Sequence, residues 1–248
     1  MACLSRPLVA PVARLLDCPA AGVEAWLATE RDRPGAQEHR APAAALRHGV
    51  LMALAEVPPD IGFVLGQIWR KWQGALRRGF NPEPPAPQTA RAILSFDEGL
   101  KRYSYGPPVR TARELLMLIE AGLVDLLAAE DPDILLTPEG WQLVEEDATA
   151  HAQVMVDAVL PAPDLERLDD PLLAGLRDAG RLILHGEGLA ARIRPDGRLL
   201  DREGQPQPGL SLLGRLALGS MIAVDSVHDC FGRAAHRWAR TVLERVHG

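Results

Sequence analysis

Apolar side chains return every three or four residues along several stretches of the chain, which is the spacing of one buried helix face. One such stripe lies near the carboxyl end and comprises Val224, Val227, Phe231, Ala235, Trp238, Val242 and Val246. A short apolar run, Leu210–Leu213, and a glycine-rich turn precede it. The pattern predicts a strand, a tight turn and one long final helix.

The same reasoning predicts helices over residues 43–57, 61–79, 89–100, 111–121 and 171–179. Asp60 and Thr111 carry side chains that cap helix amino ends, and Asp169 or Asp170 does so for the last of these helices. Gly122 is a typical carboxyl-terminal stop. The amino-terminal region is therefore expected to be helical.

Strand signals appear beyond residue 130. Apolar runs at 134–136 and 154–160 are separated by turn residues, and a hairpin is predicted over 189–200 with its turn at 195–197. We expect the run at 154–160 to end at the edge of a parallel sheet, where ligand sites form. Together with the helices, these strands predict a mixed α/β fold.

Alternate prolines mark residues 81–87, and such a sequence favours an extended spacer. We therefore predict a helical region over 1–80, a Pro-rich linker over 81–88 and an α/β region over 89–248. The helix at 61–79 also holds tryptophans among basic residues. We interpret it as a packing helix, with a partner-docking face and a nucleic-acid or lipid surface as the alternatives.

Composition narrows the class of protein. With 47% apolar and 24% charged residues, a chain of 248 residues suits a soluble protein of one or two domains. The formal charge of -6 argues against a general nucleic-acid binder, and no apolar run approaches the roughly 20 residues that cross a bilayer. Cys3, Cys18 and Cys230 are scattered and odd in number, and Pro7 and Pro11 interrupt a signal-peptide core. These features predict a cytoplasmic protein without membrane or nucleic-acid partners.

Metal and hydrolase signatures are missing from the sequence. His228 and Cys230 point to different sides of the predicted helix, and His236 lies more than two turns from His228, so no tetrahedral metal site is expected. The chain has no G-x-S-x-G, H-E-x-x-H or P-loop motif.

The glycine-rich turn is the sharpest candidate for a ligand site. Gly214-Arg215 and Gly219-Ser220 stand between the predicted strand and helix, where backbone N–H groups and the positive helix end can approach an electron-rich ligand. Arg215 can pair with a phosphate. An ordinary strand-to-helix turn capped by Ser220 explains the same residues. Asp225 fits a ribityl hydroxyl or a substrate ammonium, or is a solvated carboxylate.

Short sequence blocks extend over residues 100–240. They are Tyr105-Gly106-Pro107-Pro108, Glu120–Val124, Val156–Leu160, Gly209-Leu210, Gly214-Arg215, Gly219-Ser220, Asp225-Ser226, His228–Gly232 and Trp238-Ala239. Together they resemble the closing segment of a family of large bacterial FAD/NAD(P)-binding proteins. Members of that family begin with a strand, a G-x-G-x-x-G turn and a helix that hold the FAD pyrophosphate. This chain contains no such fingerprint, since Leu189-Ala190-Ala191 follow the nearest approach, Gly186-x-Gly188.

The resemblance implies a partial dinucleotide-binding-type domain with a long carboxyl-terminal helix. It also implies FAD as cofactor, NAD(P)H as electron donor, and a partner chain that carries the G-x-G-x-x-G motif in a hetero-oligomer. The cofactor-binding residues that it indicates are Gly209, Gly214, Arg215, Gly219, Ser220 and Asp225. No catalytic acid or base is indicated, and monooxygenation is one reaction class among several.

Two other interpretations stay open at this point. The segments can belong to a non-catalytic interaction or scaffold protein that keeps the fold without the cofactor. The chain can also be a fragment that results from a misplaced start codon.

Overall fold

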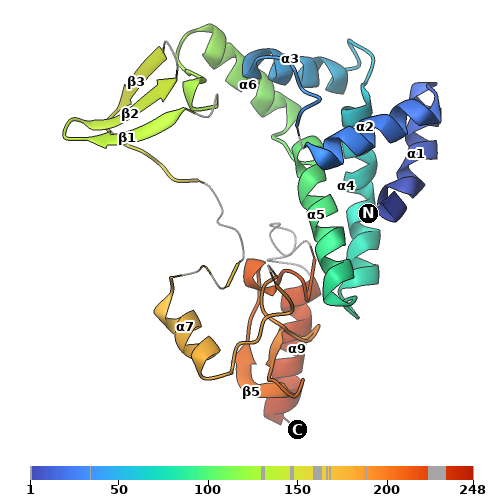
Figure 1. Ribbon diagram of the computed structural model, residues 1–248, viewed down its shortest axis with the longest axis vertical. Helices are drawn as coiled ribbons and strands as arrows, with labels where there is room; N and C mark the ends of the chain where they lie inside the picture. Colours follow the sequence, from blue (N-terminus) through green and yellow to red (C-terminus); the bar gives the residue numbers. More distant parts are fainter. Residues whose placement is uncertain are drawn as a thin grey trace. The chain divides into compact units, whose positions relative to one another are not determined.

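The computed structural model has helices in its amino-terminal part and small antiparallel sheets beyond them (Figure 1). The predicted mixed α/β class is thereby confirmed. Two compact units are present: the amino unit comprises Ala2–Gln67 and Gly99–Leu160, and the carboxyl unit comprises Ile68–Glu98 and Pro161–Gly248. The predicted linker at 81–88 falls within the carboxyl unit, and the predicted domain division stays a prediction. The structure describes residues 2–33, 35–129, 132–145, 148–158, 164–165, 167, 169–187, 189–222 and 233–247.

The amino unit contains two pairs of packed helices. They are α1 (Ala2–Leu16) with α2 (Ala20–Asp32), and α3 (Pro42–Ala53) with α6 (Val109–Glu120). Val50 of α3 packs against Ala112 and Leu116 of α6, and Arg47 forms an ion pair with Glu120. The helix predicted over 111–121 starts two residues earlier, and Pro108 rather than Thr111 is its N-cap residue.

Two long helices, α4 (Ile61–Phe80) and α5 (Pro87–Ser104), contribute residues to both units and confirm the helices predicted at 61–79 and 89–100. The predicted cap is also confirmed, because Asp60 Oδ1 accepts a hydrogen bond of 2.8 Å from the Phe63 amide. In the carboxyl unit, the buried Asp97 carboxylate on α5 accepts bonds from Trp69 Nε1 at 2.7 Å and Gln73 Nε2 at 2.8 Å on α4. Trp69 is therefore a packing residue.

A three-stranded antiparallel sheet of the amino unit has the order β1-β2-β3. Its strands are β1 (Asp133–Thr137), β2 (Gly140–Glu145) and β3 (Ala148–Ala152). Thr137 is paired with Gly140, so the turn predicted here closes a β-hairpin. The strand predicted at 154–160 is wrong over 154–158, which have no regular secondary structure; β3, which ends at Ala152, pairs with β2 instead. Residues 159 and 160 lie outside the described part of the chain.

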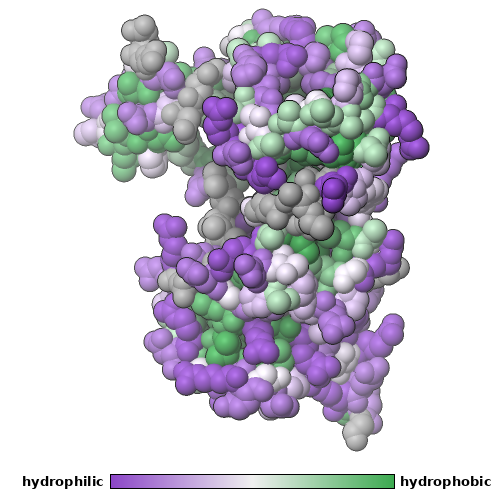
Figure 2. Space-filling view, turned by 45° about the vertical axis from the view of Figure 1, so that its right-hand side comes forward, coloured by the Kyte–Doolittle hydropathy of each residue, from purple (hydrophilic) through white to green (hydrophobic). Residues whose placement is uncertain are grey.

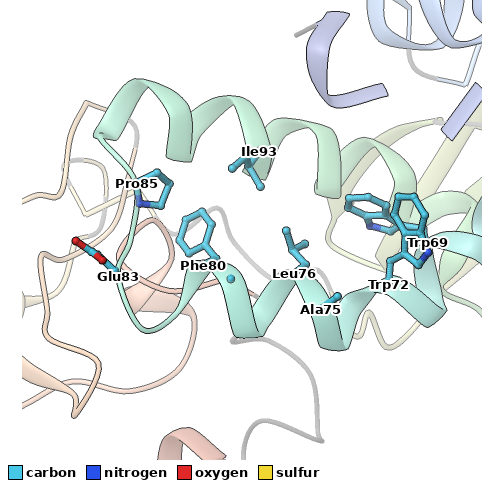
Figure 3. A pocket seen from close by; sticks show the side chains of 9 residues that line it. Trp69, Trp72, Ala75, Leu76, Phe80, Glu83, Pro85 and Ile93 are labelled. Atoms are coloured by element: carbon cyan, nitrogen blue, oxygen red, sulfur yellow. The ribbon is translucent and has the colours of Figure 1, made fainter. Parts of the chain in front are cut away.

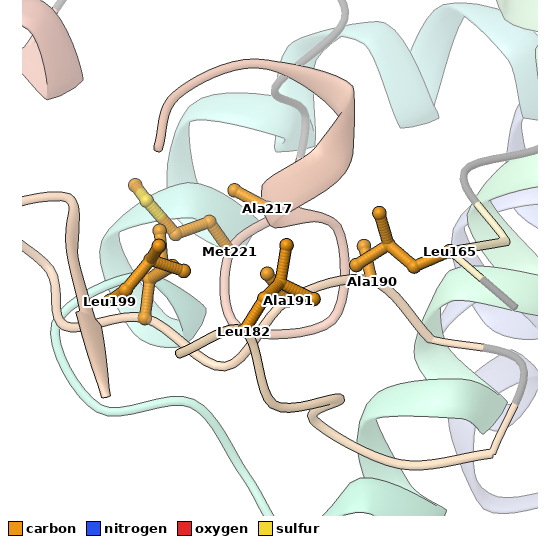
Figure 4. Close-up of a cluster of buried hydrophobic side chains, with 8 residues drawn as sticks. Leu165, Leu182, Ala190, Ala191, Leu199, Ala217 and Met221 are labelled. Carbon is orange, nitrogen blue, oxygen red and sulfur yellow. The ribbon is translucent and has the colours of Figure 1, made fainter. Parts of the chain in front are cut away.

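The carboxyl unit is built around a cluster of buried aliphatic side chains (Figure 4). It includes Leu182, Ala190, Ala191, Ile193, Leu199, Ala217 and Met221. The elements around it are α7 (Pro171–Asp178), β4 (Arg198–Leu200), β5 (Pro206–Ser211), the short helix η2 (Arg215–Ala217) and α9 (Arg233–His247). Asp170 caps α7 through a 2.9 Å bond from the Leu173 amide, as predicted.

The hairpin predicted over 189–200 is present as an antiparallel bridge between Ile193 and Leu199, and β4 pairs in addition with β5. The long final helix is present as α9 from Arg233, while residues 223–232, which hold the start predicted for it, lie outside the described residues. None of the described helices is long and apolar enough to cross a membrane.

Candidate functional site

The first half of the glycine-rich turn leaves its backbone open. Gly214 follows β5 and has φ 83° and ψ -158°, a conformation that side chains disfavour strongly. A Cβ atom at Gly214 would meet no atom of the described residues within 4 Å. Arg215 comes next, half-buried, and begins η2. Among the described residues, nothing therefore blocks the approach of a ligand to the main chain at Gly214.

The second half of the turn is packed into the interior. A Cβ atom on Gly219, whose φ is 109°, would lie 3.0 Å from Leu189 Cβ. Ser220 has 1% of its surface exposed; its hydroxyl donates to the Ala191 carbonyl at 2.9 Å and accepts from the Ile193 amide at 3.1 Å. Gly219 and Ser220 thus have structural roles within the carboxyl unit, and the cofactor role predicted for them stays a prediction.

Gly209 lies in a different place, on the wall of a groove of about 500 Å³ between β5 and α9. Gly209 is exposed with φ 76°, and a Cβ atom there would meet no atom within 4 Å in the part of the chain that the structure describes. The other lining residues are Ser211 of β5 and Trp238, Val242, Arg245 and Val246 of α9. We call the space between these six residues the β5–α9 groove.

The hairpin turn lies close to the indole of Trp238. Gly197 has φ 86°, and a Cβ atom at this position would lie 3.5 Å from Trp238 Cδ1. Arg237 Nε donates to the Pro195 carbonyl at 3.0 Å, which ties α9 to the same turn. Burial raises the pKa of Asp196, but the hydrogen bonds and charge of Arg198 outweigh burial and leave this pKa below its ordinary value. The turn is thereby held in shape by an ionised carboxylate.

The β5–α9 groove combines groups that suit a planar anionic ligand. Trp238 offers an aromatic face for stacking, Val242 and Val246 offer apolar surface, and the exposed Arg245 offers a cation at the rim. Trp238 and Arg245 were not among the predicted site residues. Their spacing of seven residues, two helical turns, was the signal in the sequence that could have placed them on one face.

A second cavity, of about 440 Å³, lies in the carboxyl unit between α4 and α5 (Figure 3). Its walls are mainly apolar, with Glu83 as the acidic member; the lining residues are Trp69, Trp72, Ala75, Leu76, Gly79, Phe80, Glu83, Pro85 and Ile93. Of the predicted site residues that the structure describes, none lines this cavity.

Asp225, the remaining predicted residue, lies outside the described residues, as do His228 and Cys230. Within the described part of the chain, no group of three or more His, Cys, Asp or Glu side chains is arranged to hold a metal ion. The predicted set is therefore divided between the open turn at Gly214-Arg215, the buried pair Gly219-Ser220, and Gly209 in the β5–α9 groove.

Comparison with protein-family models gives no match. Among curated proteins, the chain is similar to an L-aspartate N-monooxygenase (nitrosuccinate-forming) of Streptomyces davaonensis, with 31% identity over 139 residues. The similar region is 50% of this chain and 20% of the relative. The chain thus spans about a fifth of the length of this relative.

Proposed function

We propose that this chain is the carboxyl-terminal-type part of a flavin-dependent oxidoreductase of the monooxygenase class. The observation that carries the proposal is its 31% identity over 139 residues to a monooxygenase of which this match covers 20%. The resemblance of its sequence blocks to FAD/NAD(P)-binding proteins points in the same direction.

The residues of the carboxyl unit fit a flavin nucleotide in two places. The open backbone at Gly214 and the side chain of Arg215 can bind a phosphate or the carbonyl edge of the ring. The indole of Trp238 can stack on a planar ring, and Arg245 can neutralise a phosphate beside it. The bound flavin would supply the redox chemistry, with NAD(P)H as electron donor, while this chain would bind and orient the flavin.

The proposal includes a second polypeptide that carries the G-x-G-x-x-G turn. The chain has no such motif of its own, and the remaining four fifths of the relative has no counterpart in the match. A strand, glycine turn and helix on the partner would hold the FAD pyrophosphate.

A non-catalytic scaffold is the second candidate, and one observation favours it. Gly219 and Ser220 are buried and make their contacts inside the carboxyl unit, so these motif residues have a structural reason to be present without any cofactor. In this case the chain would bind its partner through the same surfaces and hold no flavin.

Purification of the tagged chain together with the product of a neighbouring reading frame that encodes the G-x-G-x-x-G motif tests both candidates. We expect a yellow complex with the absorption bands of a flavin. Arg215→Ala should lower the flavin content, whereas Arg202→Ala, at an exposed arginine of the same unit, should not. A colourless complex, together with a chain that does not bind added FAD, would contradict the flavin proposal and support the scaffold.

A further inference from the structure

The edge strand β1 exposes three consecutive large apolar side chains. Ile134 is 53% exposed, Leu135 49% and Leu136 72%. Because successive side chains of a strand point to opposite faces, Ile134 and Leu136 lie on one face of the sheet and Leu135 lies on the other. Figure 2 shows apolar side chains gathered on the part of the amino unit that holds this sheet.

The backbone of β1 is paired on one side only. Within the described residues, β1 pairs with β2 and has no second strand beside it. An edge strand of this kind presents alternate N–H and C=O groups to any other extended chain, and apolar edges are normally protected by charge, proline or a covering element. β1 carries one charge, at its first residue Asp133, and Pro132 and Pro138 flank it; its three central residues contain neither a charge nor a proline.

We propose that β1 pairs antiparallel with β1 of a second copy of this chain, about a two-fold axis that passes beside Leu135. The two three-stranded sheets then form one continuous sheet across the dimer. The pairing is isologous, since the same patch serves both copies. It does not depend on the flavin proposal.

The sequence of β1 is self-complementary in this register. Leu135 lies opposite Leu135 of the second copy, Ile134 lies opposite Leu136, and Asp133 lies opposite Thr137. Apolar side chains therefore meet apolar ones, and no like charges face each other directly. The other edge strand, β3, has the sequence Ala-Thr-Ala-His-Ala and offers no large apolar side chain. These features favour β1 over β3 as the strand that pairs. They also favour a second copy over an unrelated strand as its partner.

The interface is small, because β1 has five residues. Five paired residues bury less surface than a stable dimer normally does, so we expect a dimer that dissociates on dilution. Sedimentation velocity of the full chain over a wide concentration range should show a reversible monomer–dimer equilibrium.

Leu135→Lys should abolish the dimer, because two cations would lie opposite each other at the two-fold axis. Thr149→Lys is the matched control: it adds the same charge at an exposed position of β3, on the same face of the sheet, and should leave the equilibrium unchanged. Far-ultraviolet circular dichroism of both variants checks that they fold.

A pair of substitutions at Thr137 tests the register itself. Thr137→Lys would face Asp133 of the second copy, while Thr137→Asp would place two acids opposite each other; both variants lose the same bond from Thr137 Oγ1 to the Gly140 carbonyl. Each substitution acts at two symmetric positions, so the dimer dissociation constants of the two variants should differ by at least about fivefold. The lysine variant should form the tighter dimer. Equal constants would overturn the register.

Oxidation of Leu135→Cys provides a direct measurement. Residues directly opposite on antiparallel strands have Cβ atoms about 4.5–5.5 Å apart, close to disulfide range, so this variant should form a covalent dimer. Thr149→Cys should form no more covalent dimer than the wild-type chain does. A wild-type chain that is monomeric at every concentration, or a Leu135→Cys variant that does not cross-link, would overturn the proposal.

Discussion

The side-chain amide of Asn81 binds both backbone groups of Ile222, 141 residues further along the chain. The Ile222 amide donates to Asn81 Oδ1 at 2.8 Å, and Asn81 Nδ2 donates to the Ile222 carbonyl at 3.3 Å. Both residues are buried. The pair fixes the end of α4 to the segment that follows the glycine-rich turn, within the carboxyl unit.

Asn81→Ala should lower the free energy of unfolding by about 2–4 kcal/mol, because it leaves two buried backbone groups without their partner. Urea unfolding of the purified chain measures the change. Gln88→Ala, at an exposed position on α5, should alter the same quantity by less than about 0.5 kcal/mol. If Asn81→Ala changes the free energy of unfolding only slightly, water has taken over the hydrogen bonds of the Asn81 side-chain amide.

Local patterns in the sequence were sufficient to predict the described helices from α3 onward, but they did not define α1 and α2 or the pairing of the strands. The stripe along α4 and the caps at Asp60 and Asp170 depend on residues within a few positions of each other, and the structure confirms them. Residues 154–158 have an apolar composition that suits a strand, yet none of the described segments pairs with them. Their prediction failed because a strand needs a neighbour, and the composition of a segment does not supply one.

The candidate site was predictable from the sequence only where it depends on residues close together in the chain. Gly209, Gly214 and Gly219 all have positive φ angles. Several glycines within a short segment are a local signal for such turns. The contacts of Ser220, however, are made with residues 27 and 29 positions earlier, and no local motif indicates them. Likewise, Trp238 belongs to a groove only because β5 lies beside α9.

Ser220→Ala should destabilise the carboxyl unit by about 1–3 kcal/mol, since the buried Ile193 amide loses its acceptor. Thermal unfolding monitored by circular dichroism measures this loss. Ser95→Ala on the exposed side of α5 is the control and should be nearly neutral. An equally neutral Ser220→Ala would show that its two hydrogen bonds contribute little to stability.

Three glycine-to-alanine substitutions should change the free energy of unfolding by amounts that differ in size and sign. Gly214→Ala should cost about 1–3 kcal/mol through backbone strain alone, because its surroundings are open. Gly219→Ala should cost more, since the added Cβ atom also presses on Leu189. Gly175→Ala, in the middle of α7 with free space around it, should stabilise by about 0.5–1 kcal/mol. Unfolding free energies that do not follow this order would contradict the backbone geometry of the turn.

His185 should make the stability of the chain depend on pH. Burial lowers the pKa of His185, the positive charge of Arg192 lowers it further, and the bond to the Pro85 backbone opposes both. The unfolded chain therefore takes up this proton near the ordinary pKa of about 6.5, before the folded chain does. Stability should fall as the pH drops through that value, and His185→Gln should flatten this part of the curve. An unchanged slope in His185→Gln would contradict this prediction.

Trp238→Leu should weaken FAD binding if the β5–α9 groove holds the flavin or its adenine ring. Loss of aromatic stacking costs about 1 kcal/mol or more, which corresponds to at least about fivefold weaker binding. Equilibrium dialysis of FAD against the purified complex measures the constant, and Trp238→Phe should keep most of the affinity. Trp72→Leu is the matched control, because Trp72 lines the cavity between α4 and α5 instead. A folded Trp238→Leu variant that binds FAD as tightly as the wild-type chain would exclude this groove and leave the open turn at Gly214-Arg215 as the place where this chain contacts the cofactor.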